Sequence, residues 1–319
     1  MNNPIFDDYP DLVQELNQVY VLINQRLQSS EEKFTNLITS IFNENSKMIR
    51  PALCLIGASY NKKVLDKAIS LAAAIEMMHV ASLVHDDIID QAKLRRNQPT
   101  INSQFDDGYA VICGDYLFAK AYEIVIETQD IDRIAKMSLN LTTLIFGEVE
   151  QYLDRYNEEI NVERYLSIIN KKTATFLSTS LVLGAHLAKI KAEEIDILDE
   201  VGHAMGMLFQ IQDDLLDFET IDQIGKSSKS DVLRGTYSLP IIIAIEENNE
   251  LKQYLKDNKT NLDYDYFMEQ ILKTNALSIT ENYIDEYHQK CLIEIDKLSN
   301  QDVQEKLRHL VSKLMKRKK

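Results

Sequence analysis

The sequence predicts an all-α protein built as a single large helical bundle. Nine glycines, five prolines and no tryptophan in 319 residues favour long helices over strands joined by tight turns. Apolar residues also recur at helical spacing along almost the whole chain, and no strand-like alternation competes with this pattern. We therefore expect residues 1–319 to form one helical domain.

Helical periodicity divides the chain into segments that are separated by polar breaks. The expected helices cover residues 11–27, 34–42, 49–60, 64–90, 109–127, 133–155, 162–188, 193–218 and 239–247, with several pieces from 250 to 317. The breaks fall at residues 43–47, 95–104 and 221–240, which are polar and carry Gly, Pro or Asn. The last break is the longest, and a long polar loop in a compact protein is often functional.

Two of the expected helices are unusually apolar. Residues 64–84 include AISLAAAIEMMHVASLV, and a helix that is apolar on all sides is buried. Residues 200–218 form a second such helix, in which Gly202 and Gly206 are four residues apart. Because glycine weakens a helix, this pair suggests a close approach to another helix or to a ligand.

Charge and cysteine content restrict the classes of function that the chain can have. Fifty acidic and 35 basic residues give a net charge of -15, which disfavours nucleic-acid binding because a phosphate backbone needs a positive surface. An acidic protein can bind diphosphate if divalent cations lie between the like charges. Three separated cysteines without a CxxC pair indicate neither a disulfide framework nor a zinc site. With an acidic N-terminus and no uninterrupted run of 18 apolar residues, we expect a cytoplasmic enzyme with at most peripheral membrane contact.

Both apolar helices end in the same acidic pattern, Asp-Asp-x-x-Asp. Its members are Asp86, Asp87 and Asp90 in the first helix, and Asp213, Asp214 and Asp217 in the second. Carboxylates four residues apart lie on one helical face, and both burial and like charge oppose their ionisation without cations. Carboxylates without Cys or His suit Mg²⁺, which takes phosphate and water oxygens as further ligands. A single copy would often be an ordinary acidic helix end, but two copies favour a metal site.

Basic residues lie near these clusters in the sequence or in the polar breaks. They are Lys47, Arg50, Arg95, Arg96, Lys172, Lys226 and Lys229. Each alone could be a solvated surface charge. As a set beside two carboxylate clusters, they describe a pocket for two diphosphates.

Two segments resemble the motifs of a known family. The chain reads HDDIIDQAKLRR from His85 and FQIQDDLLD from Phe209, and these segments resemble the trans-prenyltransferase, or polyprenyl synthetase, family. The similarity extends from about residue 40 to residue 240. It implies an isoprenoid-synthase bundle around a deep central cavity, usually dimeric, and a prenyltransferase that joins isopentenyl diphosphate head to tail with an allylic diphosphate.

The resemblance also implies roles for the acidic residues. Asp86, Asp90 and Asp213 would bind Mg²⁺ directly, with about three ions per site when substrate is bound. Asp87, Asp214 and Asp217 would orient metal-bound water. The residues expected to act in catalysis are Asp86, Asp87, Asp90, Lys172, Thr173 and Asp213.

By the same resemblance, two further sets of residues would contact the diphosphates. The isopentenyl diphosphate site would consist of Lys47, Arg50, His79 and Arg96. The allylic diphosphate site would consist of Arg95, Lys172, Thr173, Gln210 and Lys226, with Thr173 beside the reacting carbons. His79 lies two turns before Asp86 on the same helical face, which favours this role over a structural one, whereas His85 is expected to pack.

The chain departs from the family pattern in two places. Residues 45–51, NSKMIRP, keep Lys47 and Arg50 of the usual GGKRxRP but lack its glycines. Where many members read GKxTLP, residues 235–240 read GTYSLP, so a phosphate-binding lysine is missing at Thr236. Similar losses occur in catalytic subunits of two-component polyprenyl synthases. We expect a homodimer or a heterodimer with a small subunit.

Residues before the first cluster predict the length of the product. Ile75, Met78, Ala81 and Ser82 lie along or beside the helical face that leads away from Asp86. Ser82 and Ala81 lack the bulk that would close a cavity beneath a short chain, and the distance back to Ile75 is roughly 16 Å at helical rise. A product of about 20 to 40 carbons is expected, with Ile75, Met78, Leu144 or Phe146 as the floor. The alternative is that these small residues only permit close helix packing.

Two other functions share part of this pattern. A non-catalytic partner subunit would keep the fold, but six intact aspartates argue against it. A terpene cyclase shares an ionising Mg²⁺ site, but it does not need the second cluster or an isopentenyl diphosphate site. The basic C-terminus, residues 316–319, is a solvated helix end or a contact for anionic lipids.

Overall fold

The computed structural model of the chain describes residues 5–42, 47–95, 98–219, 231–259 and 261–316. In these residues nearly all regular structure is helical, apart from one pair of two-residue strands, so the predicted all-α fold is confirmed. The chain divides into two compact units. Each unit is described by itself, and a single domain stays a prediction.

Unit 1 comprises Met1–Met137 and Ser180–Ile195. Its elements are α1 (Pro10–Arg26), α2 (Glu32–Ser40), α3 (Ile49–Ala58), η1 (Lys62–Val64), α4 (Leu65–Ile89), β1 (Leu94–Arg95), β2 (Gln98–Pro99), α5 (Ile101–Gln104) and α6 (Asp107–Glu127). Parts of α7 (Ile131–Leu153), α9 (Thr175–Ala188) and α10 (Ala192–Glu219) also belong to it.

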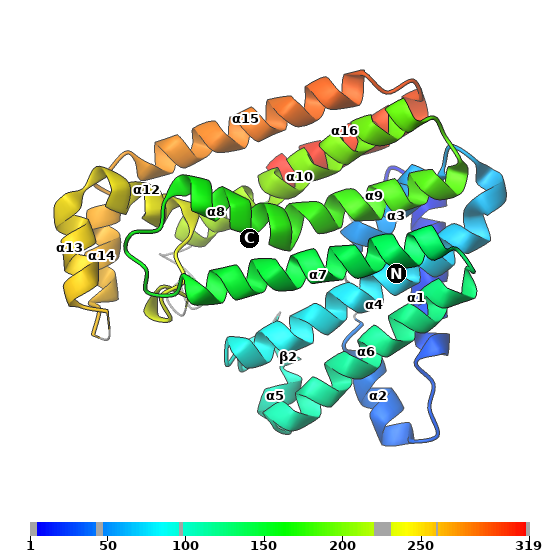
Figure 1. Cartoon of the computed structure of the whole chain (residues 1–319), viewed down its shortest axis with the longest axis horizontal. Helices are drawn as coiled ribbons and strands as arrows, with labels where there is room; N and C mark the ends of the chain where they lie inside the picture. The colour runs from blue at the N-terminus through cyan, green and yellow to red at the C-terminus, as the bar shows by residue number, and fades with distance from the viewer. Residues whose placement is uncertain (1–4, 43–46, 96–97, 220–230, 260, 317–319) are drawn as a thin grey trace. The chain divides into compact units, whose positions relative to one another are not determined.

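The core of unit 1 is built around α4. This helix packs against α1, α3 and α6, and Figure 1 shows α4 and α6 side by side. The segment Lys62–Ile89 is long and apolar enough to span a membrane, since an 18-residue window within it has a mean hydropathy of 1.5, but 78% of that window is buried. The burial predicted for residues 64–84 is therefore confirmed, and α4 is a core helix in this structure.

Unit 2 comprises Ser138–Thr179 and Asp196–Lys319. It contains the other parts of α7, α9 and α10, together with α8 (Val162–Ile169), η2 (Asn170–Ala174), α12 (Leu239–Glu247), α13 (Asn249–Asp257), α14 (Tyr264–Ile271), α15 (Ala276–Asp296) and α16 (Gln301–Met315). Asn or Asp side chains cap the amino ends of α8, α13, α14 and α16, which satisfies backbone amides that have no partner inside the helix.

The helix expected over residues 162–188 is interrupted. The segment η2 is a π-helical turn between α8 and α9, and such turns are frequent at functional sites. The predicted close approach of Gly202 and Gly206 is confirmed, because a Cβ atom on either would lie 2.3 Å from the Cα of Ser178 or Ala174. Glycine at these positions therefore lets α10 contact the backbone of η2 and α9.

Candidate active site

The first aspartate cluster lies at the carboxyl end of α4. Asp86 and Asp87 belong to the last turn of the helix, and Asp90 is its C-cap, with the Asp90 amide donating to the Asp86 carbonyl oxygen at 2.8 Å. Asp86 and Asp90 are half-buried, whereas Asp87 is buried. The two carboxylates predicted to bind metal thus reach solvent at the helix end.

Carboxylates at this position favour cation binding. The carboxyl end of a helix carries a partial negative charge, so acidic groups there are repelled by the helix and by one another. A divalent cation on Asp86 and Asp90 would remove both penalties. Among the residues that the structure describes, no group of three or more His, Cys, Asp or Glu could hold a metal ion by itself. Two half-buried carboxylates at one helix end fit Mg²⁺, which usually takes one or two carboxylates and completes its coordination with phosphate and water oxygens.

Asp87 is held by a protein donor. Arg95 Nε, on β1, donates to Asp87 Oδ1 at 2.9 Å. Burial raises the pKa of the Asp87 carboxyl, and the Arg95 charge opposes that shift. Arg95, which was predicted to contact the allylic diphosphate, is paired with the first cluster in this structure.

A second polar group joins His79 of α4 to Arg50 of α3. Arg50 Nη1, at the start of α3, is 3.0 Å from His79 Nε2. Burial lowers the pKa of Arg50 to about 10, and the charge of buried Glu76 opposes this effect. Two of the four residues predicted for isopentenyl diphosphate therefore lie together, while Lys47 is exposed.

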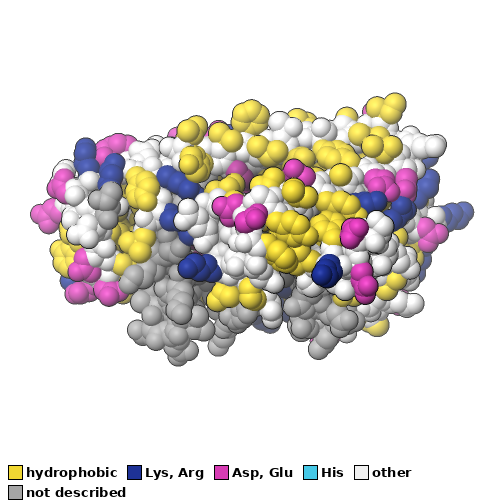
Figure 2. All heavy atoms as spheres, turned by 90° about the horizontal axis from the view of Figure 1, so that it is seen from below, with side chains coloured by type: hydrophobic (Ala, Val, Ile, Leu, Met, Phe, Trp, Pro, Cys, Tyr) yellow, Lys and Arg dark blue, Asp and Glu magenta, His cyan; other side chains and the backbone are white. Residues whose placement is uncertain are grey.

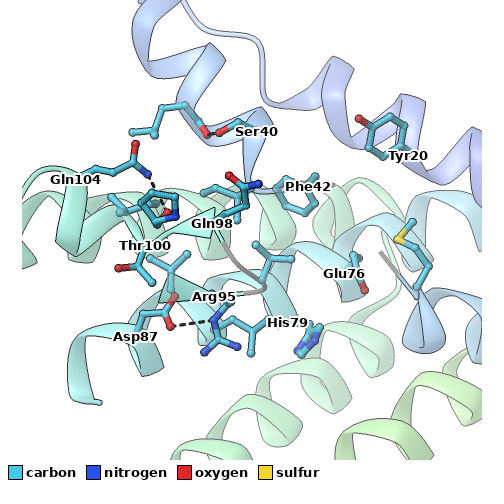
Figure 3. Close-up of a pocket in the computed structure, with 18 residues that line it drawn as sticks. Tyr20, Ser40, Phe42, Glu76, His79, Asp87, Arg95, Gln98, Thr100 and Gln104 are labelled. Atoms are coloured by element: carbon cyan, nitrogen blue, oxygen red, sulfur yellow. Dashed lines mark hydrogen bonds and ion pairs between the residues drawn. The ribbon is translucent and has the colours of Figure 1, made fainter. Parts of the chain in front are cut away.

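A cavity of about 440 Å³ opens within unit 1 beside these groups. Figure 3 shows Glu76, His79 and Asp87 of α4 and Arg95 of β1 along one side, with Tyr20 and Phe42 on the other. The apolar lining includes Leu37, Ile41, Val80, Leu83 and Ile101. The cavity thus combines a polar wall, which carries Glu76, His79 and the Asp87–Arg95 ion pair, with an apolar wall.

The second aspartate cluster lies in the last turns of α10, in unit 2. Asp213 and Asp217 are half-buried, and Asp214 is buried. Asp214 Oδ2 accepts hydrogen bonds from the Tyr165 hydroxyl at 2.7 Å and from the Leu239 amide at 3.0 Å. Burial raises the pKa of Asp214 to about 6, although its hydrogen bonds lower it. The two clusters share one pattern, in which the first and last carboxylates reach solvent and the middle one is held by protein donors.

The π-helical turn η2 carries Lys172, whose side chain contacts α7. Lys172 Nζ donates to Gln151 Oε1 at 2.8 Å and lies 2.7 Å from Glu148 Oε1. Gly147 permits this close packing, since a Cβ atom there would lie 2.9 Å from the Lys172 amide nitrogen.

The same turn is linked to the second cluster. The buried Thr173 hydroxyl donates to Gln210 Oε1 at 3.0 Å, and Gln210 Nε2 donates to Asp214 Oδ1 at 3.0 Å. The structure therefore links Thr173 and Gln210, two of the residues predicted for the allylic diphosphate, to the second aspartate cluster, and Lys172 precedes Thr173 in the same turn.

The residues predicted to set product length lie on α4. Ile75, Met78 and Ala81 are buried, and the half-buried Ser82 hydroxyl donates to the His79 carbonyl oxygen at 2.8 Å. Because this bond satisfies the hydroxyl within its own helix, Ser82 presents little polarity to a hydrocarbon. Of the two candidates on α7, Leu144 is buried whereas Phe146 is 59% exposed.

Several predicted residues lie outside the part of the chain that the structure describes. They are Arg96, Lys226, Lys229, and Asn45 and Ser46 of the altered glycine motif. Thr236, which replaces a lysine of the family pattern, is described, and its amide donates to the Asp231 carbonyl oxygen at 2.9 Å.

The partners of the predicted residues were not foreseen from the sequence. Buried Glu76 lies near Arg50, and Lys172 contacts Glu148 and Gln151. Asp214 accepts a hydrogen bond from Tyr165. Glu76 had a signal, because it is the sole acidic or basic residue between Lys67 and His79 in an otherwise apolar helix. The other three had none, since they come from distant segments.

Comparison with known proteins agrees with this geometry. Residues 31–271 match the polyprenyl synthetase family model. The chain is 31% identical over 314 residues to heptaprenyl diphosphate synthase component 2 of Bacillus subtilis (strain 168), covering 97% of this chain and 90% of that protein.

Solved structures of polyprenyl synthases are similar to the chain over nearly its whole length. A heptaprenyl diphosphate synthase from Staphylococcus aureus is 26% identical, with a TM-score of 0.88 and coverage of 97% of this chain and 99% of the other. A polyprenyl synthase from Caulobacter crescentus CB15, solved with calcium and isoprenyl diphosphate, is 25% identical, with a TM-score of 0.89 and coverage of 100% and 99%. The chain therefore belongs to the polyprenyl synthetase family and is a prenyltransferase.

Proposed function

We propose that this prenyltransferase is an all-trans polyprenyl diphosphate synthase that condenses isopentenyl diphosphate with an allylic diphosphate, using Mg²⁺, to a product of about 20 carbons or more. The observation that carries the proposal is the pair of aspartate clusters at the ends of α4 and α10, with their shared pattern of burial. The Caulobacter relative, solved with calcium and isoprenyl diphosphate, supports a divalent cation and this class of ligand.

The residues present fit the metal and its role. Asp86, Asp90 and Asp213 would hold Mg²⁺, which when bound neutralises the departing diphosphate. Asp87 and Asp214, fixed by Arg95 and by three donors, would hold the flanking carboxylates in place.

The remaining chemistry is assigned to protein side chains and substrates. Lys172 and Thr173 would contact the allylic diphosphate, whose carbon–oxygen bond breaks to leave an allylic cation and free diphosphate. The double bond of isopentenyl diphosphate then attacks the cation, and the released diphosphate accepts the proton lost from the new chain. Because no protein nucleophile is required, neither His79 nor His85 is given a proton-transfer role.

The cavity in unit 1 is the proposed isopentenyl diphosphate site. His79 lines it, and Arg50 Nη1 is 3.0 Å from His79 Nε2, so a guanidinium group lies beside this wall. Guanidinium groups suit this task because they stay protonated and bind phosphate oxygens in pairs. Arg50 stays largely protonated at neutral pH even with its pKa lowered to about 10.

We also infer that the chain works as a dimer, either with itself or with a smaller subunit. Relatives named component 2 of heptaprenyl diphosphate synthase support a second polypeptide. Figure 2 shows hydrophobic side chains gathered at the surface. Exposed apolar residues include Ile112 and Ile126 on α6, and Leu139, Phe146 and Leu153 on α7. A cytoplasmic location belongs to the same proposal.

Product analysis tests this function. The purified chain would be incubated with Mg²⁺, farnesyl diphosphate and labelled isopentenyl diphosphate, and the products separated by carbon number. A product of defined length from the chain alone supports a self-sufficient synthase. Incorporation only after addition of a small subunit supports a two-component enzyme, and no incorporation in either case refutes the proposal.

A further inference from the structure

The π-helical turn η2 is held in place by a histidine that the proposed chemistry does not use. His203, on α10, has its Nδ1 atom 3.0 Å from Asn170 Oδ1, at the first residue of the turn. Because the Asn170 oxygen can only accept, the His203 Nδ1 atom is the donor in this arrangement. The His203 ring is half-buried.

The surroundings of His203 restrict its position. Gly202 and Gly206 flank it in the sequence and let α10 touch the backbone at Ser178 and Ala174. On the far side of the ring, Nε2 lies 3.8 Å from Asp199 Oδ1, and that carboxylate accepts a hydrogen bond from the buried Ser178 hydroxyl. The ring thus lies between Asn170 and Asp199, and its hydrogen bond is to Asn170.

The turn needs such support because it is irregular. A π-helical turn contains one more residue than an α-helical turn, and such turns are rare and occur mostly as single turns inside α-helices. If η2 relaxed to an α-helix, the residues it carries would rotate by about 100° about the helix axis. Lys172 would then leave Glu148 and Gln151, and Thr173 would leave Gln210.

We propose that His203 is a positioning residue, which holds Asn170 and thereby keeps Lys172 and Thr173 directed toward the allylic diphosphate. The proposal rests on the proposed function, because that function assigns the two side chains to the allylic substrate. It adds a residue that touches no substrate and acts through the backbone of η2.

Two substitutions separate the hydrogen bond from simple packing. H203L removes the donor and keeps an apolar side chain of comparable size. H203N keeps a donor, because its Nδ2 atom occupies about the place of the His Nδ1 atom. The control is L198A, which removes buried volume from α10 more than one turn before His203.

Steady-state kinetics and hydrogen exchange are the two measurements, made with whichever subunits the wild type requires. We expect H203L to raise the KM for the allylic diphosphate about tenfold, which corresponds to the loss of one hydrogen bond. The KM for isopentenyl diphosphate should change by no more than about twofold. The amides of residues 170–175 should exchange faster in H203L than in the wild type. H203N should behave like the wild type, and L198A should lower the Tm without changing the ratio of the two KM values.

The proposal is overturned if an active wild type and H203L have the same allylic KM, or if L198A shifts that KM as much as H203L does. Unchanged exchange in residues 170–175 of H203L also overturns it. Failure of the proposed function looks different, because the wild type itself would then form no condensation product, whereas exchange is measured without turnover.

Discussion

Substituting Tyr165 by Phe tests how the second aspartate cluster is held. The Tyr165 hydroxyl is 2.7 Å from Asp214 Oδ2, and both residues are buried. At pH 8, above the Asp214 pKa of about 6, the acceptor is ionised, and a buried hydrogen bond to a charged group contributes about 1.5–3 kcal/mol. We expect Y165F to lower the free energy of unfolding by that amount in urea denaturation.

A second tyrosine provides the matched control. The Tyr60 hydroxyl donates to Glu194 Oε2 at 2.9 Å, but this pair is only half-buried. Because solvent replaces a lost bond there, Y60F should cost about 1 kcal/mol or less. If Y165F costs no more than Y60F, burial does not strengthen the Asp214 contact and the reasoning fails.

Three further outcomes follow from the structure. Burial raises the pKa of Cys54 and of Cys291 to about 12, so Ellman's reagent at pH 8 should label these thiols slowly in the native chain and fully in urea; fast native labelling would contradict their burial. Hydrogen bonding to Lys259 lowers the pKa of Glu158 from 4.5 to about 2. The ionised Glu158 therefore stabilises the fold fully above about pH 5, and this contribution is lost as the pH falls toward 2. E158Q should make the Tm depend less on pH in this acid range, and an unchanged dependence would argue against the ion pair. S82F should shorten the product, because an aromatic ring on α4 obstructs the hydrocarbon, whereas S82A should not; equal product lengths for both would remove Ser82 from the length-determining face.

Features with a local physical cause could be predicted from the sequence. The helical period alone indicates α4 and α10, and their apolar composition indicates burial, which the structure confirms. The spacing of Gly202 and Gly206 also predicts close packing, because two glycines four residues apart leave one helical face without side chains. The aspartate spacing placed the outer carboxylates of each cluster on one helical face.

Features that depend on distant partners could not be predicted. Nothing in NKKTA, residues 170–174, distinguishes a π-helical turn from an α-helix, because the turn is stabilised by His203 and by packing against Gly147 and Gly206. The Lys172–Glu148 pair joins segments whose contact only the fold defines. The antiparallel pair of β1 and β2 likewise falls in a segment that the sequence predicts to be irregular, since two-residue strands are too short to show a period.

The proposed function requires metal-binding carboxylates in both aspartate clusters. It is tested most directly by incorporation of labelled isopentenyl diphosphate by wild type, D86N and D213N, each with Mg²⁺ and with EDTA. We expect EDTA to abolish incorporation by the wild type, and each substitution to lower kcat/KM by about 100-fold or more without unfolding the chain. Near-wild-type incorporation by folded D86N or D213N, or incorporation that persists in EDTA, would contradict it.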